Sequence, residues 1–471
     1  MNPLNNNTVK NRKKLPVKVL QFGEGNFLRA FVDWIIDKLN EETDFNGGIC
    51  VVQPIKEGMV KMLNDQDGLY HVWLNGISHG KKVNEKRLIT SIVNGINPYD
   101  DYKAFLKLAE NDDLRFIFSN TTESGIVFES SDKSIDQLPA GFPGKLTALL
   151  YHRFEHYKGA ADKGLIIIPC ELIDKNGTNL KAAILQYAKH FQLPEEFAQW
   201  IDNSNYFCNT LVDRIVPGYP RESILQVQQE LQYEDKLVVK AEPFYLWVIE
   251  GDERVKEEFP TEKLGLQVKF VKDITPYRTR KVRILNGAHT SIVHRAYLEG
   301  LRTVEAVIND QKMNSFLERI IFKEIIPTLD LPESELVEFA NDVLERFNNP
   351  FIRHELISIT LNSISKFKVR VLPSILEYRN RFNKWPESLL QSFAALFVFY
   401  RGEWKGEKIQ LNDSAEVLAL LKNAWNGDKF DANGILSNTN LWGQDLTQLE
   451  GLKEQVQMNI NQLLEKEKEK A

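Results

Sequence analysis

The sequence predicts an α/β domain with a doubly wound, mainly parallel sheet, followed by a mostly α-helical domain. Up to about residue 275, short apolar runs typical of buried strands alternate with segments of helical periodicity. Beyond that point helical periodicity continues with few strand signals, and a length of 471 residues is sufficient for two large domains. We therefore expect domains at 1–273 and 274–471, with Pro276 close to the boundary.

The first elements are expected to form a βαβ unit. Residues 17–22 are an apolar, β-branched run that ends at Gly23-Glu24-Gly25, and helical spacing follows over 29–42. A glycine-rich turn at 46–48 separates this helix from a second buried strand at 49–54. Further strands are predicted at 115–120, 165–170, 237–240, 244–249 and 268–271.

The carboxyl-terminal half is expected to consist of consecutive helices, because apolar and polar residues alternate there mostly at the helical period. The predicted helical segments are 281–299, 310–327, 333–346, 353–368, 371–381, 387–401, 414–425 and 447–466.

Composition limits the class of protein. With 59 basic and 65 acidic residues the net charge is −6, whereas a protein that binds a phosphate backbone needs a basic excess, so we expect no nucleic acid partner. The three cysteines are far apart and offer neither a disulfide framework nor a metal clip. No apolar run approaches the roughly 18 residues of a membrane span, and the amino terminus lacks the apolar region of a signal peptide. A soluble, cytoplasmic protein without a membrane partner is expected, and its oligomeric state is left open.

The turn after the first strand resembles a dinucleotide fingerprint. Glycines there permit a tight turn and let backbone N–H groups approach a pyrophosphate at a helix start. The pattern departs from GxGxxG because Leu28 occupies the third glycine position, and a turn without a ligand is the alternative. The candidate cofactor contacts in this turn are Gly23, Gly25, Asn26, Phe27 and Arg29.

The residues alone leave NAD and NADP as alternatives. The acid that holds the adenosine ribose is expected at the end of the second strand, where this chain has Gln53 and Pro54. Gln53 can bond a ribose hydroxyl without repelling a 2′-phosphate, and Lys56 is close enough in sequence to attract one. Asn120 ends another predicted strand and is a further candidate cofactor contact.

The strongest catalytic candidate is the set Lys281, Asn286 and His289. At 100° per residue along an α-helix, His289 lies about 80° from Lys281 and about 60° from Asn286, so all three can face one cleft. A lysine, an amide donor and an imidazole suit a carbonyl that is protonated as hydride arrives. An ordinary exposed helical face is the competing interpretation. The nearby cations Arg278, Arg280 and Arg283 would attract an anionic substrate.

Other reaction centres lack their parts. The chain has no HExxH, GxxxxGK[ST] or GxSxG sequence and no paired cysteine ligands, so we expect a metal-free mechanism. His294 is interpreted as structural rather than as a ligand. The adjacent Asp213 and Arg214 are interpreted mainly as a structural ion pair. Lys366 lies either on a solvated face of a helix or where it can bind a substrate carboxylate.

Six segments together resemble the mannitol dehydrogenase family, also called the polyol-specific long-chain dehydrogenases. They are QFGEGNFLRAFVDW, SNTTESGI, IIIPCELID, TLVDRIV, KVRILNGAHT and DLTQLEGL, and the similarity runs from residue 17 to about 465. The resemblance implies an NAD(P)-dependent, zinc-independent secondary-alcohol dehydrogenase with a Rossmann-like amino-terminal domain and a helical carboxyl-terminal domain.

The resemblance also implies roles for individual residues. Lys281 would be the general acid/base, Asn286 and His289 would orient and polarise the reacting oxygen, and Lys366 and Asp213 would contact the substrate. Members that act on uncharged polyols carry an asparagine where Leu172 stands, an arginine where Ser358 stands and an acid where Arg278 stands. Arg278 is therefore a candidate contact for a sugar acid.

Through its longer segments, the resemblance implies reduction of D-tagaturonate to D-altronate with NADH in hexuronate catabolism. The alternatives are reduction of the epimeric fructuronate to mannonate and a nucleotide-binding regulator that has lost catalysis.

Overall fold

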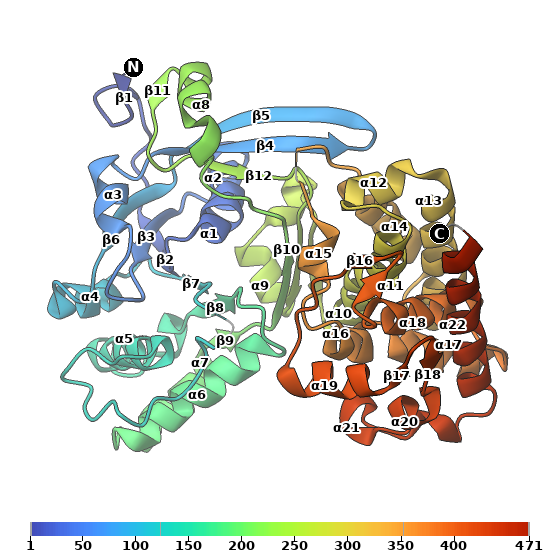
Figure 1. Cartoon of the computed structure of the whole chain (residues 1–471). Helices are drawn as coiled ribbons and strands as arrows, with labels where there is room; N and C mark the ends of the chain where they lie inside the picture. The colour runs from blue at the N-terminus through green and yellow to red at the C-terminus, as the bar shows by residue number, and fades with distance from the viewer. Residues whose placement is uncertain (1, 123, 352, 470–471) are drawn as a thin grey trace. The chain divides into compact units, whose positions relative to one another are not determined.

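The computed structural model describes residues 2–122, 124–351 and 353–469, which divide into two compact units (Figure 1). Unit 1 runs to Gly76 and resumes from Lys82 to Ile274. Unit 2 comprises Ile77–Lys81 together with the chain from Thr275 onward. Unit 1 contains the large sheet, and unit 2 is mostly helical, as predicted.

The centre of unit 1 is a six-stranded sheet in the order β6-β3-β2-β7-β8-β9, and every neighbouring pair is parallel. The predicted parallel sheet is therefore confirmed. Phe22 pairs with Val52 on one side and with Ser119 on the other, so three strands end at the same level. The strands are β2 (Val17–Phe22), β3 (Gly48–Val52), β6 (Ile92–Ile96), β7 (Phe116–Ser119), β8 (Ile166–Pro169) and β9 (Tyr206–Phe207).

Both faces of this sheet are buried, because alternate residues of a strand enter different apolar clusters. Val19 packs with the helices α2 (Val32–Glu42) and α9 (Glu253–Glu258), whereas the next residue, Leu20, packs with helices on the other face. Those helices are α4 (Tyr102–Lys107), α5 (Phe142–His156), α6 (Asn176–His190) and α7 (Glu195–Ser204). This two-sided burial explains why the four inner strands are continuous apolar runs in the sequence.

Three predicted strands exist but lie outside the large sheet. They are β12 (Val239–Ala241), β13 (Leu246–Glu250) and β14 (Val268–Val271). β13 pairs antiparallel with β10 (Thr210–Asp213) and parallel with β14, and β12 pairs parallel with β4 (Tyr70–Ser78). β4 shares its sheet with β5 (Lys81–Ile89), and a third small sheet joins β1 (Asn2–Pro3) to β11 (Tyr233–Glu234). The remaining helices of unit 1 are α1 (Asn26–Ala30), α3 (Val60–Asp65) and α8 (Ile224–Leu231).

Unit 2 is organised around the helix α18 (Glu387–Phe399). Nearly all of its residues are buried, and it packs against both α11 (Gly287–Leu298) and α22 (Leu452–Glu469). A helix that is apolar on all sides belongs in the interior of a helical domain. The other helices are α10 (Thr275–Arg280), α12 (Val304–Asn309), α13 (Gln311–Glu318), α14 (Glu333–Phe347), α15 (Leu356–Ile359), α16 (Ser363–Arg370), α17 (Leu372–Phe382), α19 (Ala415–Asn423), α20 (Ala432–Leu436) and α21 (Thr439–Trp442).

The predicted helix at 353–368 is wrong as a single element. Asn362 adopts a left-handed conformation with φ of 52°, which separates α15 from α16. Two short hairpins also interrupt the predicted succession of helices: β15 (Glu403–Trp404) with β16 (Glu407–Lys408), and β17 (Trp425–Asn426) with β18 (Lys429–Phe430).

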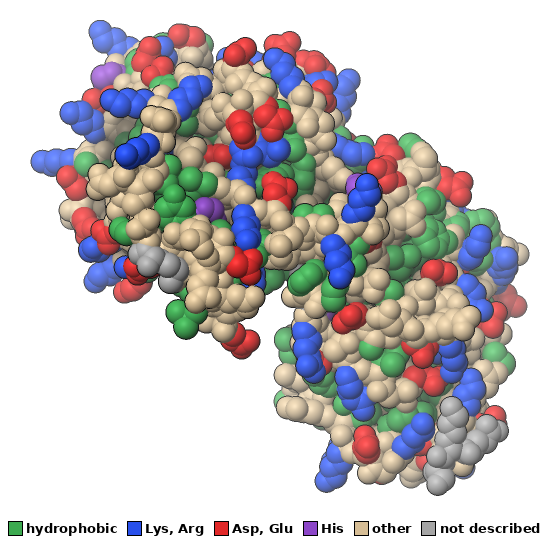
Figure 2. All heavy atoms as spheres, turned by 90° about the horizontal axis from the view of Figure 1, so that it is seen from above, with side chains coloured by type: hydrophobic (Ala, Val, Ile, Leu, Met, Phe, Trp, Pro, Cys, Tyr) green, Lys and Arg blue, Asp and Glu red, His purple; other side chains and the backbone are tan. Residues whose placement is uncertain are grey.

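The surface carries charges of both signs. Figure 2 shows Lys and Arg side chains interspersed with Asp and Glu over the visible face. Within the described part of the chain, no helix has the length and hydropathy to cross a bilayer.

Candidate active site

The turn after β2 has the backbone geometry of a close-approach site. Gly23 has φ of +124°, and a Cβ there would lie 3.1 Å from the backbone oxygen of Asn120, so a side chain would be strained. Its N–H donates to the oxygen of Val52 at 3.1 Å, which ties the turn to the end of β3. A Cβ added to Gly25 would meet no atom within 4 Å. The open space above Gly25 lets a ligand approach the backbone there.

The helix predicted at 29–42 is divided in the structure. Phe31, with φ of −126° and ψ of −77°, separates the short helix α1 from α2. The ring of Phe27 stacks on that of Phe31, with centroids 4.9 Å apart, and joins the apolar core. Asn26 is exposed and accepts a hydrogen bond at 2.8 Å from Arg29 Nη2. Phe27 and Asn26 therefore differ as candidate cofactor contacts, because the side chain of Asn26 is exposed whereas the ring of Phe27 packs against the core.

The Arg29 guanidinium is an internal tether of the turn. Its side chain is 2% exposed, and Nε donates to the oxygen of Glu24 at 3.0 Å while Nη1 donates to the oxygen of Leu237. Burial lowers the pKa of Arg29 despite the opposing effect of nearby acids, of which Asp33 is one. The guanidinium therefore donates to three protein oxygens, those of Glu24, Leu237 and Asn26 Oδ1. The sequence had instead suggested that Arg29 contacts the cofactor.

Gln53 and Asn120 flank the turn, each with its side-chain amide engaged. The Gln53 amide donates to the oxygens of Ile55 at 3.0 Å and Lys56 at 2.9 Å. The Asn120 amide donates to the oxygen of Cys170 at 2.6 Å, which joins the ends of β7 and β8. The level strand ends bring both residues to the edge where a doubly wound sheet binds its ligand, as the sequence predicted.

In unit 2, the helix that contains Lys281 is confirmed, but its predicted α-helical geometry is wrong over six residues. Lys281–Asn286 is π-helical, and the N–H of Gly287 donates to the oxygen of Val282, five residues earlier. A π-helix places residues i and i+5 next to each other, so Lys281 and Asn286 are closer in angle than α-helical spacing allows. Such turns are frequent at functional sites.

Lys281, Asn286 and His289 are half-buried, while most residues between them are fully buried. The three therefore lie at a partly accessible face. The His289 ring stacks on Phe347 at 4.0 Å between centroids and meets His354 edge-on at 5.0 Å. These rings fix the plane of the imidazole, and neither was singled out from the sequence because both lie far from His289 along the chain.

Lys366 is held close to this segment by helix packing. A Cβ on Gly287 would lie only 3.1 Å from the backbone oxygen of Arg370, so α11 and α16 approach closely. Lys366 lies on α16, and its Nζ donates to the oxygen of Ile359 at 3.0 Å. Burial and the charge of Arg370 lower the pKa of Lys366, while Asp413 opposes the shift.

His294 is structural, as expected. It is completely buried, and its Nε2 lies 2.9 Å from the hydroxyl of Ser363 at the start of α16. Burial, with a smaller contribution from Lys366, lowers the pKa of His294 to about 3. The neutral imidazole thus links α11 to α16.

The predicted cation cluster is only partly available to a substrate. Arg280 is 3% exposed, lies over the ring of Phe339 at 4.4 Å and is 3.9 Å from a carboxylate oxygen of Glu335. Arg283 is half-buried, and burial lowers its pKa to about 10. Arg278 is half-buried on α10. In unit 1, Asp213 ends β10 and is 6% exposed.

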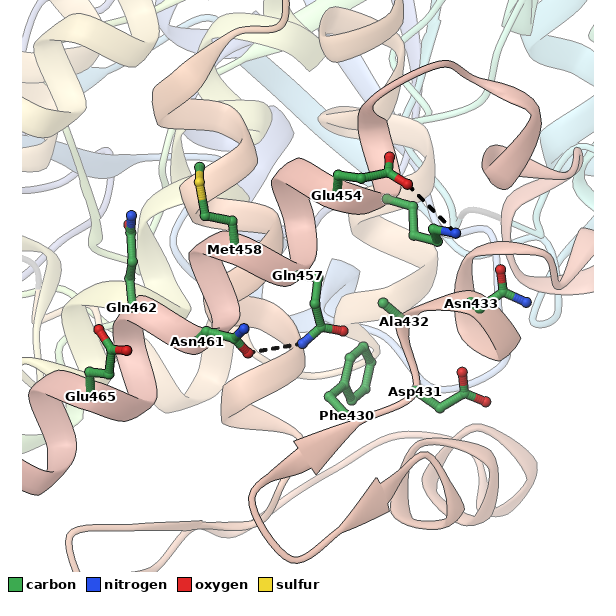
Figure 3. Close-up of a pocket in the computed structure, with 11 residues that line it drawn as sticks. Phe430, Asp431, Ala432, Asn433, Glu454, Gln457, Met458, Asn461, Gln462 and Glu465 are labelled. Carbon is green, nitrogen blue, oxygen red and sulfur yellow. Dashed lines mark hydrogen bonds and ion pairs between the residues drawn. The ribbon is translucent and has the colours of Figure 1, made fainter.

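A groove of about 710 Å³ lies elsewhere in unit 2, between α22 and the segment that contains β18 and α20 (Figure 3). Its polar groups interact along α22, where Gln457 donates to Asn461 at 3.0 Å and Lys453 lies 3.6 Å from Glu454 (Figure 3). None of the candidate site residues lines it.

Comparisons with known proteins cover nearly the whole chain. Residues 17–263 match the model of the mannitol dehydrogenase Rossmann domain, and residues 273–464 match that of the mannitol dehydrogenase C-terminal domain. The chain is 49% identical over 458 residues to an altronate oxidoreductase of Yersinia enterocolitica, which covers 96% of this chain and 95% of the relative. It is 47% identical over 459 residues to the altronate oxidoreductase of Shigella flexneri, with 96% and 95% covered.

Solved structures share the fold. A substrate-free D-sorbitol dehydrogenase matches with a TM-score of 0.81 and 23% identity, covering 96% of this chain and 94% of the other. Mannitol 2-dehydrogenase of Pseudomonas fluorescens, in a ternary complex with NAD and D-mannitol, matches with a TM-score of 0.66 and 22% identity, covering 96% and 92%. From the two family models and the full-length relatives, we conclude that the chain belongs to the mannitol dehydrogenase family.

Proposed function

We propose that the chain is a cytoplasmic NAD-dependent oxidoreductase that reduces D-tagaturonate to D-altronate in hexuronate catabolism. The observation that carries this proposal is the 49% identity, over 96% of the chain, to a protein named altronate oxidoreductase. The half-buried set of Lys281, Asn286 and His289 supports it, since it supplies a proton donor and two orienting groups. We assign cofactor binding to the predicted domain 1–273 and catalysis to 274–471.

The turn after β2 fits a dinucleotide, because the space above Gly25 is open and Gly23 holds a positive φ. The residues that would hold the cofactor are Gly23, Gly25, Asn26, Phe27 and Asn120, with Arg29 acting through the turn and Gln53 through the loop after β3. When bound, the reduced nicotinamide supplies a hydride to the ketone carbon. The other elements of the chemistry come from side chains of unit 2.

Lys281 donates a proton from Nζ to the ketone oxygen as that oxygen gains negative charge. The product is a secondary hydroxyl, and in the reverse direction neutral Lys281 accepts the hydroxyl proton. The side-chain N–H groups of Asn286 and His289 bond the same oxygen and stabilise its charge by a few kcal/mol each. Phe347 and His354 keep the His289 ring in one orientation, so this stabilisation requires little reorganisation.

A uronate carries a carboxylate that needs a cationic partner. Burial and Arg370 lower the pKa of Lys366, so the charge of Asp413 compensates its ammonium form only in part. A substrate carboxylate would supply that charge. We propose Lys366 and Arg278 as its partners, and Asp213 as a contact for the sugar hydroxyls.

A spectrophotometric panel tests the proposed function. The full-length protein is mixed with D-tagaturonate or D-fructuronate and with NADH or NADPH, and loss of absorbance at the reduced nicotinamide band is followed. We expect tagaturonate with NADH to be fastest. Faster turnover of fructuronate would reassign the chain to the epimeric reaction, and no turnover of either acid would refute the catalytic proposal.

A further inference from the structure

The sequence has no acid at the end of β3 to bind the adenosine ribose, and Gln53 is poorly placed to bind the ribose instead. The side-chain amide of Gln53 has two N–H groups, and these donate to the oxygens of Ile55 and Lys56. The amide oxygen lies 3.4 Å from the N–H of Val60. With both donors used, Gln53 shapes the loop from Pro54 to Met59 and has no spare N–H for a ribose hydroxyl.

A carboxylate lies beside Gln53 nevertheless, and it comes from the Gly turn. A Cβ on Gly58 would lie 2.2 Å from Glu24 Oε1 and 2.4 Å from Gln53 Cδ, so both side chains contact the same glycine. Glu24 Oε1 also accepts the N–H of Met59 at 3.0 Å. Glu24 is therefore placed where the turn after β2 meets the loop after β3.

The Glu24 carboxylate has capacity left for a ligand. An ionised carboxylate offers about four acceptor positions, and Met59 occupies one of them. The backbone N–H of Glu24 itself also stabilises the carboxylate, and two donors still leave acceptor positions for a ligand. Burial raises the pKa of Glu24, whereas the Met59 N–H and the charge of Arg29 oppose this shift and favour the anion.

We infer that Glu24 selects NAD over NADP by accepting a hydrogen bond from the adenosine ribose and repelling a 2′-phosphate. This inference rests on the proposed function, since it requires a dinucleotide on the turn after β2. A doubly wound fold takes the ribose acid from the end of the second strand, and Glu24 reaches the loop that follows this strand from the turn after β2. Lys56 on the same loop is exposed and would favour a phosphate, so the two residues act in opposite directions.

The test is direct binding of reduced cofactor to the full-length protein without sugar substrate. NADH and NADPH are titrated at pH 8 against the wild type and Glu24→Gln, and quenching of tryptophan fluorescence gives each Kd. The amide oxygen of the glutamine can still accept the Met59 N–H, so the variant removes mainly the charge. We expect the wild type to prefer NADH, and the Kd ratio to shift toward NADPH by on the order of tenfold or more in Glu24→Gln.

Controls separate this effect from general electrostatics and from misfolding. Glu57→Gln removes an exposed acid of the same loop and should leave the Kd ratio within about twofold, and Glu24→Asp, which keeps the charge, should retain the preference for NADH. If Glu24→Gln does not fold, Glu24→Ser removes the same charge. Equal binding of NADH and NADPH by the wild type, or an unchanged ratio in the neutral variants, would overturn the inference, whereas failure of the wild type to bind either would overturn the proposed function itself.

Discussion

Arg29→Met should destabilise unit 1 and weaken cofactor binding indirectly. The guanidinium makes three hydrogen bonds, to the oxygens of Glu24 and Leu237 and to the side chain of Asn26. Each bond from a charged donor contributes about 1.5–3 kcal/mol, so the gross loss is about 5–9 kcal/mol. Removing a buried cation recovers part of its desolvation cost, which leaves a net loss of about 3–5 kcal/mol.

Urea unfolding followed by tryptophan fluorescence measures the free energy of unfolding, and NADH titration of the folded variant measures affinity. We expect both to fall, because the turn loses the group that holds Glu24 and Asn26 together. Arg29→Lys should recover little stability, since one ammonium group cannot reach three separated oxygens.

The opposite pattern would refute this reasoning. If Arg29→Met unfolds within about 1 kcal/mol of the wild type and yet loses NADH affinity, Arg29 contacts the dinucleotide directly, as its place in the motif suggests. The two measurements therefore decide between a tether and a ligand.

Three further predictions concern unit 2. Lys281→Ala should lower kcat by about 10²–10⁴-fold with the NADH Kd within twofold, and wild-type turnover in steady-state assays would contradict its role. The pKa of His294 is about 3 when folded and about 6.5 when unfolded, so its contribution to stability is present above pH 6.5 and is lost as the pH falls. From pH 7 to pH 5 it should cost about 2 kcal/mol in urea unfolding, and an equal pH slope in His294→Gln would contradict this. Gly287→Ala should push against Arg370, cost about 1–3 kcal/mol and raise the substrate KM, and an unchanged KM would show that the helix contact does not position the site.

The parts of the fold that the sequence predicted are those determined by burial. The four inner strands of the large sheet form apolar runs because both faces are covered, whereas its edge strands β6 and β9 were not predicted. Gly23-Glu24-Gly25 marks the turn because its first glycine needs a positive φ. The missed β5 carries mostly exposed polar residues and has no apolar pattern to detect. Strand assignment to separate sheets also depends on long-range pairing, which local periodicity does not contain.

The sequence proposes the residues of the candidate site but only part of their geometry. Lys281, Asn286 and His289 could be selected by chemical type, whereas no local pattern of the sequence indicated the π-helical turn. Glu24 was overlooked because the expected acid belongs to the end of the second strand, and only the contact through Gly58 shows its position.

The π-helical turn changes the direction in which side chains point along one continuous helix, so α10 and α11 present their side chains at different angles. An extra residue in a turn rotates everything that follows by roughly 100° relative to an uninterrupted α-helix. The part before it can direct Arg280 at Phe339, while the part after it directs His289 at Phe347, although both rings belong to α14. Loss of a single residue between Lys281 and Asn286 would therefore redirect every side chain of α11 without replacing any of them.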